Sequence, residues 1–83
     1  MRLSAGAQIR AARALLRLER AELAKLTGVS ESTLKRLEGV DGRFDARLST
    51  VEALERFFAE RGVTLFDGNE PGARLRLGSP AGA

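Results

Sequence analysis

The sequence predicts a small, mainly helical domain of four helices followed by a C-terminal β-hairpin. In four stretches between residues 5 and 61, apolar residues recur at helical spacing, and glycines or capping residues separate these stretches. After residue 62 the pattern changes to β-rich runs around a turn-forming segment. The length of 83 residues allows one small domain, because a second hydrophobic core would have almost nothing to bury.

The composition argues against several classes of protein. An apolar fraction of 43% and a charged fraction of 30% are typical of a folded domain. The chain has no Cys and no His, so it lacks disulfides, the usual soft metal ligands and the most common catalytic base. We therefore expect no enzyme, no metal and no cofactor. No apolar run approaches the roughly 18 residues of a membrane span, and the start does not resemble a signal peptide, which favours the cytoplasm.

The first helix is predicted over residues 5–18. Its apolar side chains recur with the period of one helix face: Ala5, Ile9, Ala12 and Leu16. Three arginines form a parallel stripe beside that face: Arg10, Arg13 and Arg17. Such a stripe is either a solvated basic face or a functional surface, and the sequence leaves both interpretations open.

The second and third helices are short and close together in the sequence. The second is predicted over residues 20–27 and ends at Gly28, because glycine tolerates the left-handed backbone past a helix end. The third is predicted over residues 31–38, with Ser30 as its N-cap. The residues that these two helices are expected to turn inward are Leu23, Ala24, Leu34 and Leu37.

A loop and a fourth helix complete the helical part. Residues 39–48 have loop composition, and two apolar side chains are expected to pin them to the core: Phe44 and Leu48. The fourth helix is predicted over residues 50–61, because Ser49 and Glu52 have the spacing of a capping box. Its inner face is expected to contain Val51, Leu54, Phe57 and Phe58.

The remaining residues predict a β-hairpin. Residues 63–66 and 73–77 are β-rich, and a strong turn composition separates them. An isolated hairpin is marginally stable in water, so we expect it to lie against the helices or to extend into a larger sheet. The expected organisation is a helical domain over residues 1–62, a hairpin over residues 63–77 and a frayed end over residues 78–83.

Residues 20–38 have the arrangement of a helix-turn-helix motif. The positions that need small, apolar, turn-permissive or capping residues are occupied by Leu23-Ala24, Gly28-Val29-Ser30, Leu34 and Leu37-Glu38. On these residues the chain resembles the lambda repressor-like (Xre/Cro) family of bacterial and phage DNA-binding regulators, over about residues 6–60. The resemblance implies a four-helix lambda repressor-like domain, with the hairpin in place of a fifth helix.

The resemblance also implies roles for individual residues. The third helix would enter the DNA major groove and read base edges with Glu31, Ser32, Lys35 and Arg36. Phosphate contacts would come from Arg20, Lys25, Ser30, Arg43 and Arg47. Arg13 and Glu38 match a structural ion pair of the family, which joins the first helix to the end of the third. Two positions depart from the family pattern: Arg17 stands where a turn glycine is frequent, and Glu19 where a small polar cap is usual.

Regulators of this family generally bind palindromic sites as dimers. An open hairpin edge invites strand addition, so we expect a homodimer through the hairpin. The residues expected at that interface are Val63, Leu65, Phe66, Leu75 and Leu77.

The leading functional prediction is a sequence-specific, double-stranded DNA-binding transcriptional regulator. The net charge of +3 favours an anionic partner, and residues 1–38 hold eight Lys or Arg side chains against four Glu. We expect a repressor, because 83 residues leave no room for a separate ligand-sensing domain. This expectation places the protein on a palindromic operator as a homodimer.

Three alternatives remain beside this prediction. The main one is a protein-interaction module on the same fold, an antitoxin or anti-activator that binds a partner protein, and the exposed-looking Leu15 and Leu26 favour it. RNA binding is less favoured, because the four Phe residues are better placed as core than as stacking platforms. An enzyme is less favoured still, because carboxylates such as Glu52 and Glu55 are expected on a solvated helix face.

Overall fold

The structure, a computed structural model, describes residues 2–78, and within this range it contains four helices and one two-stranded antiparallel sheet. The elements are α1 (Gly6–Leu16), α2 (Arg20–Thr27), α3 (Glu31–Glu38), α4 (Leu48–Glu60), β1 (Val63–Phe66) and β2 (Gly72–Leu75). The prediction of a mainly helical domain with a C-terminal hairpin is confirmed. The frayed end expected over residues 78–83 lies outside the described residues, apart from Gly78.

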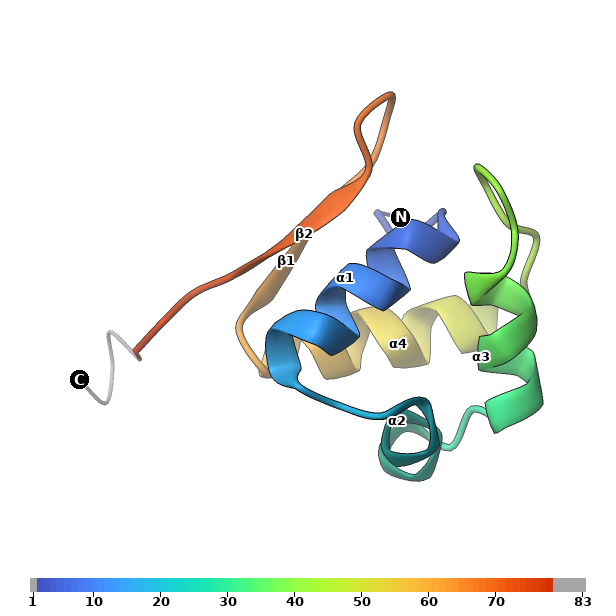
Figure 1. Cartoon of the computed structure of the whole chain (residues 1–83), viewed down its shortest axis with the longest axis horizontal. Coiled ribbons are helices and arrows are strands. Elements are labelled where there is room, and N and C mark those ends of the chain that lie inside the picture. Colours follow the sequence, from blue (N-terminus) through green and yellow to red (C-terminus); the bar gives the residue numbers. More distant parts are fainter. Residues whose placement is uncertain (1, 79–83) are drawn as a thin grey trace.

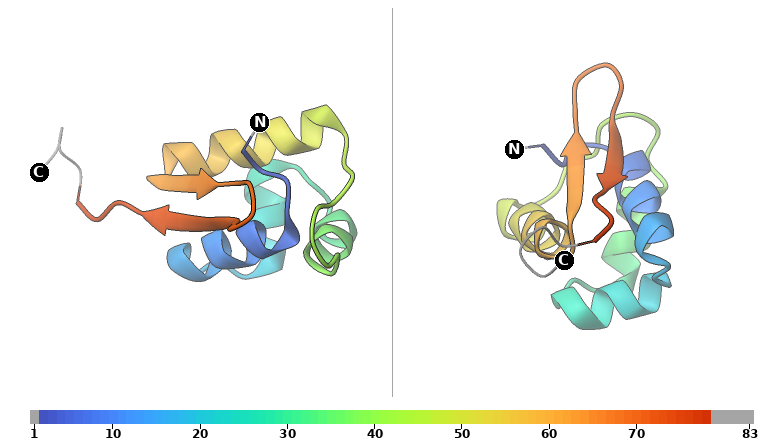
Figure 2. Two further views of the ribbon diagram at one scale, coloured as in Figure 1. Left: turned by 90° about the horizontal axis from the view of Figure 1, so that it is seen from above. Right: turned by 90° about the vertical axis from the view of Figure 1, so that its left-hand side faces the viewer.

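The helices enclose one hydrophobic core, and the hairpin covers one side of it. Figure 1 shows α3 on one side of the molecule and the hairpin on the opposite side. The strands lie over α1 and α4, with β2 beside α1 and β1 beside α4 (Figure 2). The largest fully buried apolar side chains come from all four helices: Ile9, Leu23, Leu34, Leu37, Leu54 and Phe58. All six belong to the faces expected to turn inward.

Both α2 and α3 begin and end at the residues predicted from the sequence. Gly28 has a φ of 81° and closes α2, and the Oγ of Ser30 accepts a hydrogen bond of 3.1 Å from the N–H of Thr33 at the start of α3. In contrast, α1 ends at Leu16, two residues before the predicted end. Arg17 adopts the left-handed conformation, with a φ of 57°, and this turns the chain towards α2.

The predicted start of α4 was wrong. The helix begins at Leu48, and the N–H of Val51 donates to the carbonyl of Arg47, so Ser49 already lies in the first helical turn. The Ser49 side chain therefore cannot cap the helix, and the cap residue is Arg47. Leu48 was also expected in the core, but it is 57% exposed, because it lies on the outward side of that first turn.

The hairpin packs on the same core as the helices. Val63 pairs with Leu75 and Phe66 with Gly72, so the second strand begins one residue earlier and ends two residues earlier than predicted. Val63 and Leu65 are buried under the sheet, each 5% exposed. Leu77 lies beyond the strand and is 85% exposed, because the pairing with β1 has ended before it.

Two polar side chains bind the N-terminal segment to the rest of the fold. Gln8 is fully buried, accepts hydrogen bonds from the N–H groups of Ser4 and Ala5, and donates to the carbonyl of Phe66 in β1. Glu55 accepts from the N–H groups of residues 2 and 3 at 2.8 and 2.9 Å. The expectation that Glu55 belongs to a solvated face was therefore wrong, since its carboxylate anchors the segment before α1.

Replacing Arg17 by glycine should stabilise the fold. A left-handed backbone costs a residue with a Cβ about 1–2 kcal/mol, and glycine adopts it freely. We expect Arg17→Gly to raise the free energy of unfolding by about 1 kcal/mol in chemical denaturation. Arg17→Ala is the control, because it removes the same side chain but keeps the strained backbone; an equal gain in both variants would contradict the explanation.

Candidate nucleic-acid interface

The helix α3 presents one buried face and one exposed face. Leu34 and Leu37 have no exposed surface, because the inner face packs into the core. The opposite face consists of exposed polar and charged side chains: Glu31, Ser32, Lys35 and Arg36. Ser30 caps the N-terminus, so its hydroxyl is engaged with Thr33. The four residues expected to read bases thus lie on one rigid, solvent-facing helix surface.

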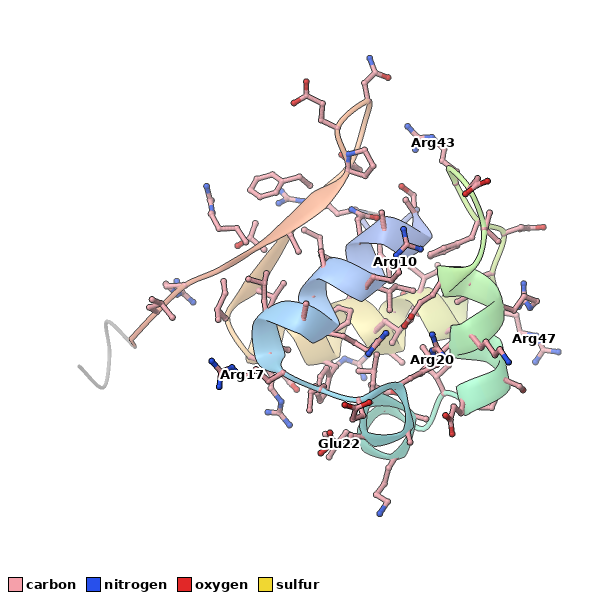
Figure 3. All side chains as sticks on the ribbon, viewed as in Figure 1. Arg10, Arg17, Arg20, Glu22, Arg43 and Arg47 are labelled. Carbon is pink, nitrogen blue, oxygen red and sulfur yellow. The ribbon has the colours of Figure 1, made fainter. Side chains whose placement is uncertain are left out.

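A shallow groove lies beside this face. Arg36 donates a hydrogen bond of 3.4 Å to the carbonyl of Asp45, which brings α3 and the loop before α4 together. The groove has a volume of about 370 Å³ and is lined by Arg36, Asp45, Ala46 and Arg47. Arg47 points into solvent beside α3 (Figure 3). The side chains of Arg36 and Arg47 therefore line the same groove beside α3.

Arg43 is directed elsewhere. Its guanidinium donates to the Oγ of Ser4 at 3.4 Å and to the carbonyl of Gly68 at 3.3 Å. Gly68 belongs to the hairpin turn, and Figure 3 shows Arg43 near the tip of the loop that follows α3. The structure thus brings Arg43 to the hairpin and not into the groove beside Arg36.

Arg13, Arg20 and Glu38 form a partly buried ion-pair network between α1, α2 and α3. The carboxylate of Glu38 accepts two hydrogen bonds of 2.8 Å from Arg13 and one of 3.1 Å from Nη2 of Arg20. The Glu38 side chain is 2% exposed, whereas that of Arg20 is 33% exposed. The structure therefore brings together Arg13 and Glu38, and it adds Arg20, which the sequence suggested only for phosphate contact.

The arginine stripe of α1 is partly structural. Arg10 donates to the main-chain carbonyl of Glu38 at the end of α3, and Arg13 pairs with the carboxylate of the same residue. Arg17, at the end of the stripe, is exposed. Arg10 and Arg13 contact the end of α3, but Arg10 and Arg17 are exposed, so the stripe combines structural contacts with a solvated basic surface.

The network shifts the ionisation of its members. Burial, the largest single influence, raises the pKa of Glu38, but the hydrogen bonds and positive charges of Arg13 and Arg20 outweigh it and hold that pKa below its ordinary value. The hydrogen bond with Glu38 raises the pKa of Arg13. Glu38 and Arg13 are therefore charged at neutral pH, and their charges satisfy each other within the fold.

The remaining candidate residues are dispersed. Lys25 is exposed on α2, where it lines a groove of about 240 Å³ with Ala21, Glu22 and Leu26. The expected interface residues of the hairpin differ in burial: the side chains of Val63 and Leu65 belong to the core, and Leu75 is partly buried. Phe66, at 39%, and Leu77, at 85%, are exposed.

Comparison with known proteins identifies the family to which the chain belongs. No helix within residues 2–78 is both long and apolar enough to span a membrane. No curated protein and no solved structure matches the chain. A family model described as "Antitoxin Xre-like helix-turn-helix domain" matches residues 2–63, which is most of the chain and includes all four helices. Domains of this kind are found in DNA-binding regulators and antitoxins, and their role is regulatory. The chain belongs to the antitoxin Xre-like helix-turn-helix family.

Proposed function

We propose that the protein is a sequence-specific, double-stranded DNA-binding repressor that acts in the cytoplasm as a homodimer on a palindromic operator. The observation that carries the proposal is the two-faced α3, whose inner face is fixed in the core and whose outer face is exposed and polar. A helix of this kind fits the DNA major groove, where side chains near its N-terminus reach base edges. The membership of the helix-turn-helix family supports the same surface.

Each exposed side chain of α3 has a chemistry that a base edge can use. Arg36 can donate two hydrogen bonds to guanine O6 and N7, and Lys35 can donate to guanine or to a phosphate. Ser32 can donate or accept at either base of a pair, and Glu31 can accept from cytosine N4. We expect Arg36 to dominate, because a bidentate pair is the most discriminating of these contacts.

Phosphate contacts would position the domain without reading sequence. Arg47 and Lys25 are exposed and have no carboxylate partner within the described residues, so both can meet phosphates directly. Arg20 keeps 33% of its side chain exposed and could touch a phosphate while it remains paired with Glu38. For Arg43 the same role would require its release from the hairpin turn.

Selection from a random duplex library tests the proposal. The wild-type chain should enrich duplexes that contain one palindromic motif, with half-sites about one helical turn apart. Single half-sites would contradict the dimer but keep sequence recognition. The absence of any enrichment, with only weak and salt-sensitive binding, would contradict sequence-specific recognition altogether.

Replacing Arg36 by alanine should reduce binding to the selected duplex by about 1–3 kcal/mol, or roughly 5- to 150-fold, because a bidentate base contact is lost. Binding to a scrambled duplex should change little. Fluorescence anisotropy on both duplexes measures the two affinities. Arg76→Ala is the matched control, because it removes the same charge from the segment after β2, on the side away from α3 (Figure 1). Equal losses for both variants would show that Arg36 contributes charge and not base recognition.

A second candidate function is an antitoxin that binds a partner protein. The family description supports it, and so do Leu15 and Leu26, which are 39% and 52% exposed. Large exposed apolar side chains are common at protein interfaces. Leu26→Ser should leave DNA binding intact and abolish capture of the partner. Loss of DNA binding in this variant would contradict a separate protein-binding surface on α2.

A further inference from the structure

The hairpin turns one face towards the core and the other towards solvent. Four side chains of its strands pack on the core: Val63, Leu65, Ala73 and Leu75. Successive side chains of a strand point to opposite faces, so Thr64, Phe66 and Arg74 lie on the other side. The N–H of Arg76 donates a hydrogen bond of 2.9 Å to the carbonyl of Gly62, which extends the ladder and adds Arg76 to that side. No helix covers it within the described residues 2–78 (Figure 2).

The hairpin outer face, which we define as Thr64, Phe66, Arg74 and Arg76, carries positive charge and no negative charge. Both arginines are exposed, and neither forms an ion pair with a carboxylate of residues 2–78. In the helical part, by contrast, two arginines share the carboxylate of Glu38. The two charges of the hairpin outer face are therefore available to an external anion.

One of these arginines is held in place by an aromatic ring. The Cζ atom of Arg74 lies 4.9 Å from the centre of the Phe66 ring, and Phe66 itself is 39% exposed. A guanidinium group that stacks on a ring keeps its N–H donors directed outward in its own plane, where they match the two oxygens of a carboxylate. Arginine and exposed aromatic side chains are also the residues enriched at protein interfaces. The pair therefore has the composition of a receptor for a carboxylate.

We propose that the hairpin outer face binds an extended acidic segment of a partner protein, in which Asp or Glu occupies alternate positions. Arg74 and Arg76 are two residues apart on an extended chain, so their Cα atoms are about 6.6–6.8 Å apart. Alternate residues of an extended peptide have the same spacing, so two carboxylates can pair with the two arginines. The exposed part of the Phe66 ring adds an apolar contact. This function goes beyond DNA binding and uses no residue of α2 or α3.

The chemistry of this face favours a polypeptide over a nucleic acid. Single-stranded nucleic acids stack their bases on open aromatic rings, but the guanidinium of Arg74 covers one face of the Phe66 ring. A phosphate backbone is also favoured by a continuous basic track, and the hairpin turn interrupts such a track with Asp67 and Glu70. A short acidic segment needs only the two arginines, so it fits the face better.

Two synthetic peptides test the charge preference of the wild-type protein. In one, glutamate and threonine alternate, and in the other, lysine and threonine alternate. Fluorescence anisotropy of the labelled peptides should show that the glutamate peptide binds at least about tenfold more tightly than the lysine peptide, and that its affinity falls as the salt concentration rises. Equal binding of the two peptides, or no binding of the glutamate peptide in low salt, would overturn the proposal.

A charge reversal tests the surface. Arg74→Glu should weaken binding of the glutamate peptide at least about tenfold, because a carboxylate then meets a carboxylate. Arg56→Glu is the matched control, since it changes the net charge equally at an exposed position on α4. Circular dichroism verifies that both variants are folded. Equal losses in the two variants would show that net charge alone attracts the peptide, and would overturn the proposal.

Amide chemical shifts locate the peptide on the wild-type protein, so this measurement does not depend on the folding of a variant. The glutamate peptide should change the amides of Thr64, Arg74 and Arg76 most, and those of α3 little. Changes concentrated on α3 would overturn the proposal, because the peptide would then only imitate DNA phosphates. A single-stranded oligonucleotide that shifts the hairpin amides more than the peptide does, at equal concentration, would assign the face to nucleic acid and also overturn it.

Discussion

Replacing Gly6 by alanine is expected to destabilise the protein by about 3 kcal/mol or more, although alanine is the better helix former. A Cβ atom on Gly6 would lie 2.3 Å from the carbonyl oxygen of Leu37 and 3.0 Å from the Cα of Glu38. Both are main-chain atoms at the end of α3, so no side-chain rotation relieves the contact. The variant can form α1 only if α1 and α3 move apart.

Chemical denaturation measures this loss, and Gly72→Ala is the matched control. A Cβ on Gly72 meets nothing within 4 Å, and its φ is not in the left-handed region. We expect the control to change the free energy of unfolding by less than about 1 kcal/mol. If Gly6→Ala were as stable as wild type, or gained the roughly 1 kcal/mol that helix propensity alone would give, the close contact of α1 and α3 would be wrong.

Replacing Glu38 by alanine should cost about 2–4 kcal/mol of stability, because it leaves two arginines without their common partner. Removing one member of a buried pair costs up to about 5 kcal/mol, and the partial exposure of Arg13 and Arg20 lowers that figure. Glu31→Ala is the control on the same helix. Its side chain is exposed, so a loss of about 0.5 kcal/mol is expected from the helix end. Similar losses in the two variants would contradict a structural role for the network.

The same network predicts an acid dependence. The pKa of Glu38 is lower in the folded protein than its ordinary value of about 4.3, so the folded state binds the proton more weakly than the unfolded chain. The contribution of Glu38 is therefore complete above about pH 5 and is lost as the pH falls through the lower folded pKa. Denaturation from pH 7 to 3 should show a steeper loss of stability in wild type than in Glu38→Gln. Parallel curves would contradict the shifted pKa.

The parts of the fold that depend on local signals could be predicted from the sequence. Gly28 and Ser30 define the ends of α2 and α3 through contacts within four residues, and both helices have the predicted bounds. The start of α4 was missed because Ser49 and Glu52 have the spacing of a capping box, and spacing does not tell whether the chain is already helical at Ser49.

Contacts between residues that are far apart in the sequence could not be predicted in the same way. Gln8 bonds to Phe66, 58 residues away, and Glu55 bonds to Leu3, 52 residues away. Gly6 looks like an unfavourable residue at the start of a helix until α3 is seen against it. The exposed face of α3 could be predicted from the periodicity of its apolar residues. The hydrogen bonds of Arg20 to Glu38 and of Arg43 to Gly68 could not, because only the structure shows that these residues are neighbours.

The measurement that tests the central claim most directly is a titration of isotopically labelled protein with a DNA duplex, followed by the chemical shifts of the amides. We predict that the largest changes fall on α3, at Ser32, Lys35 and Arg36, and on Arg47 before α4, while the amides of β1 and β2 change little. Changes concentrated on the hairpin, or no changes at any DNA concentration in low salt, would contradict the assignment of α3 as the surface that binds DNA.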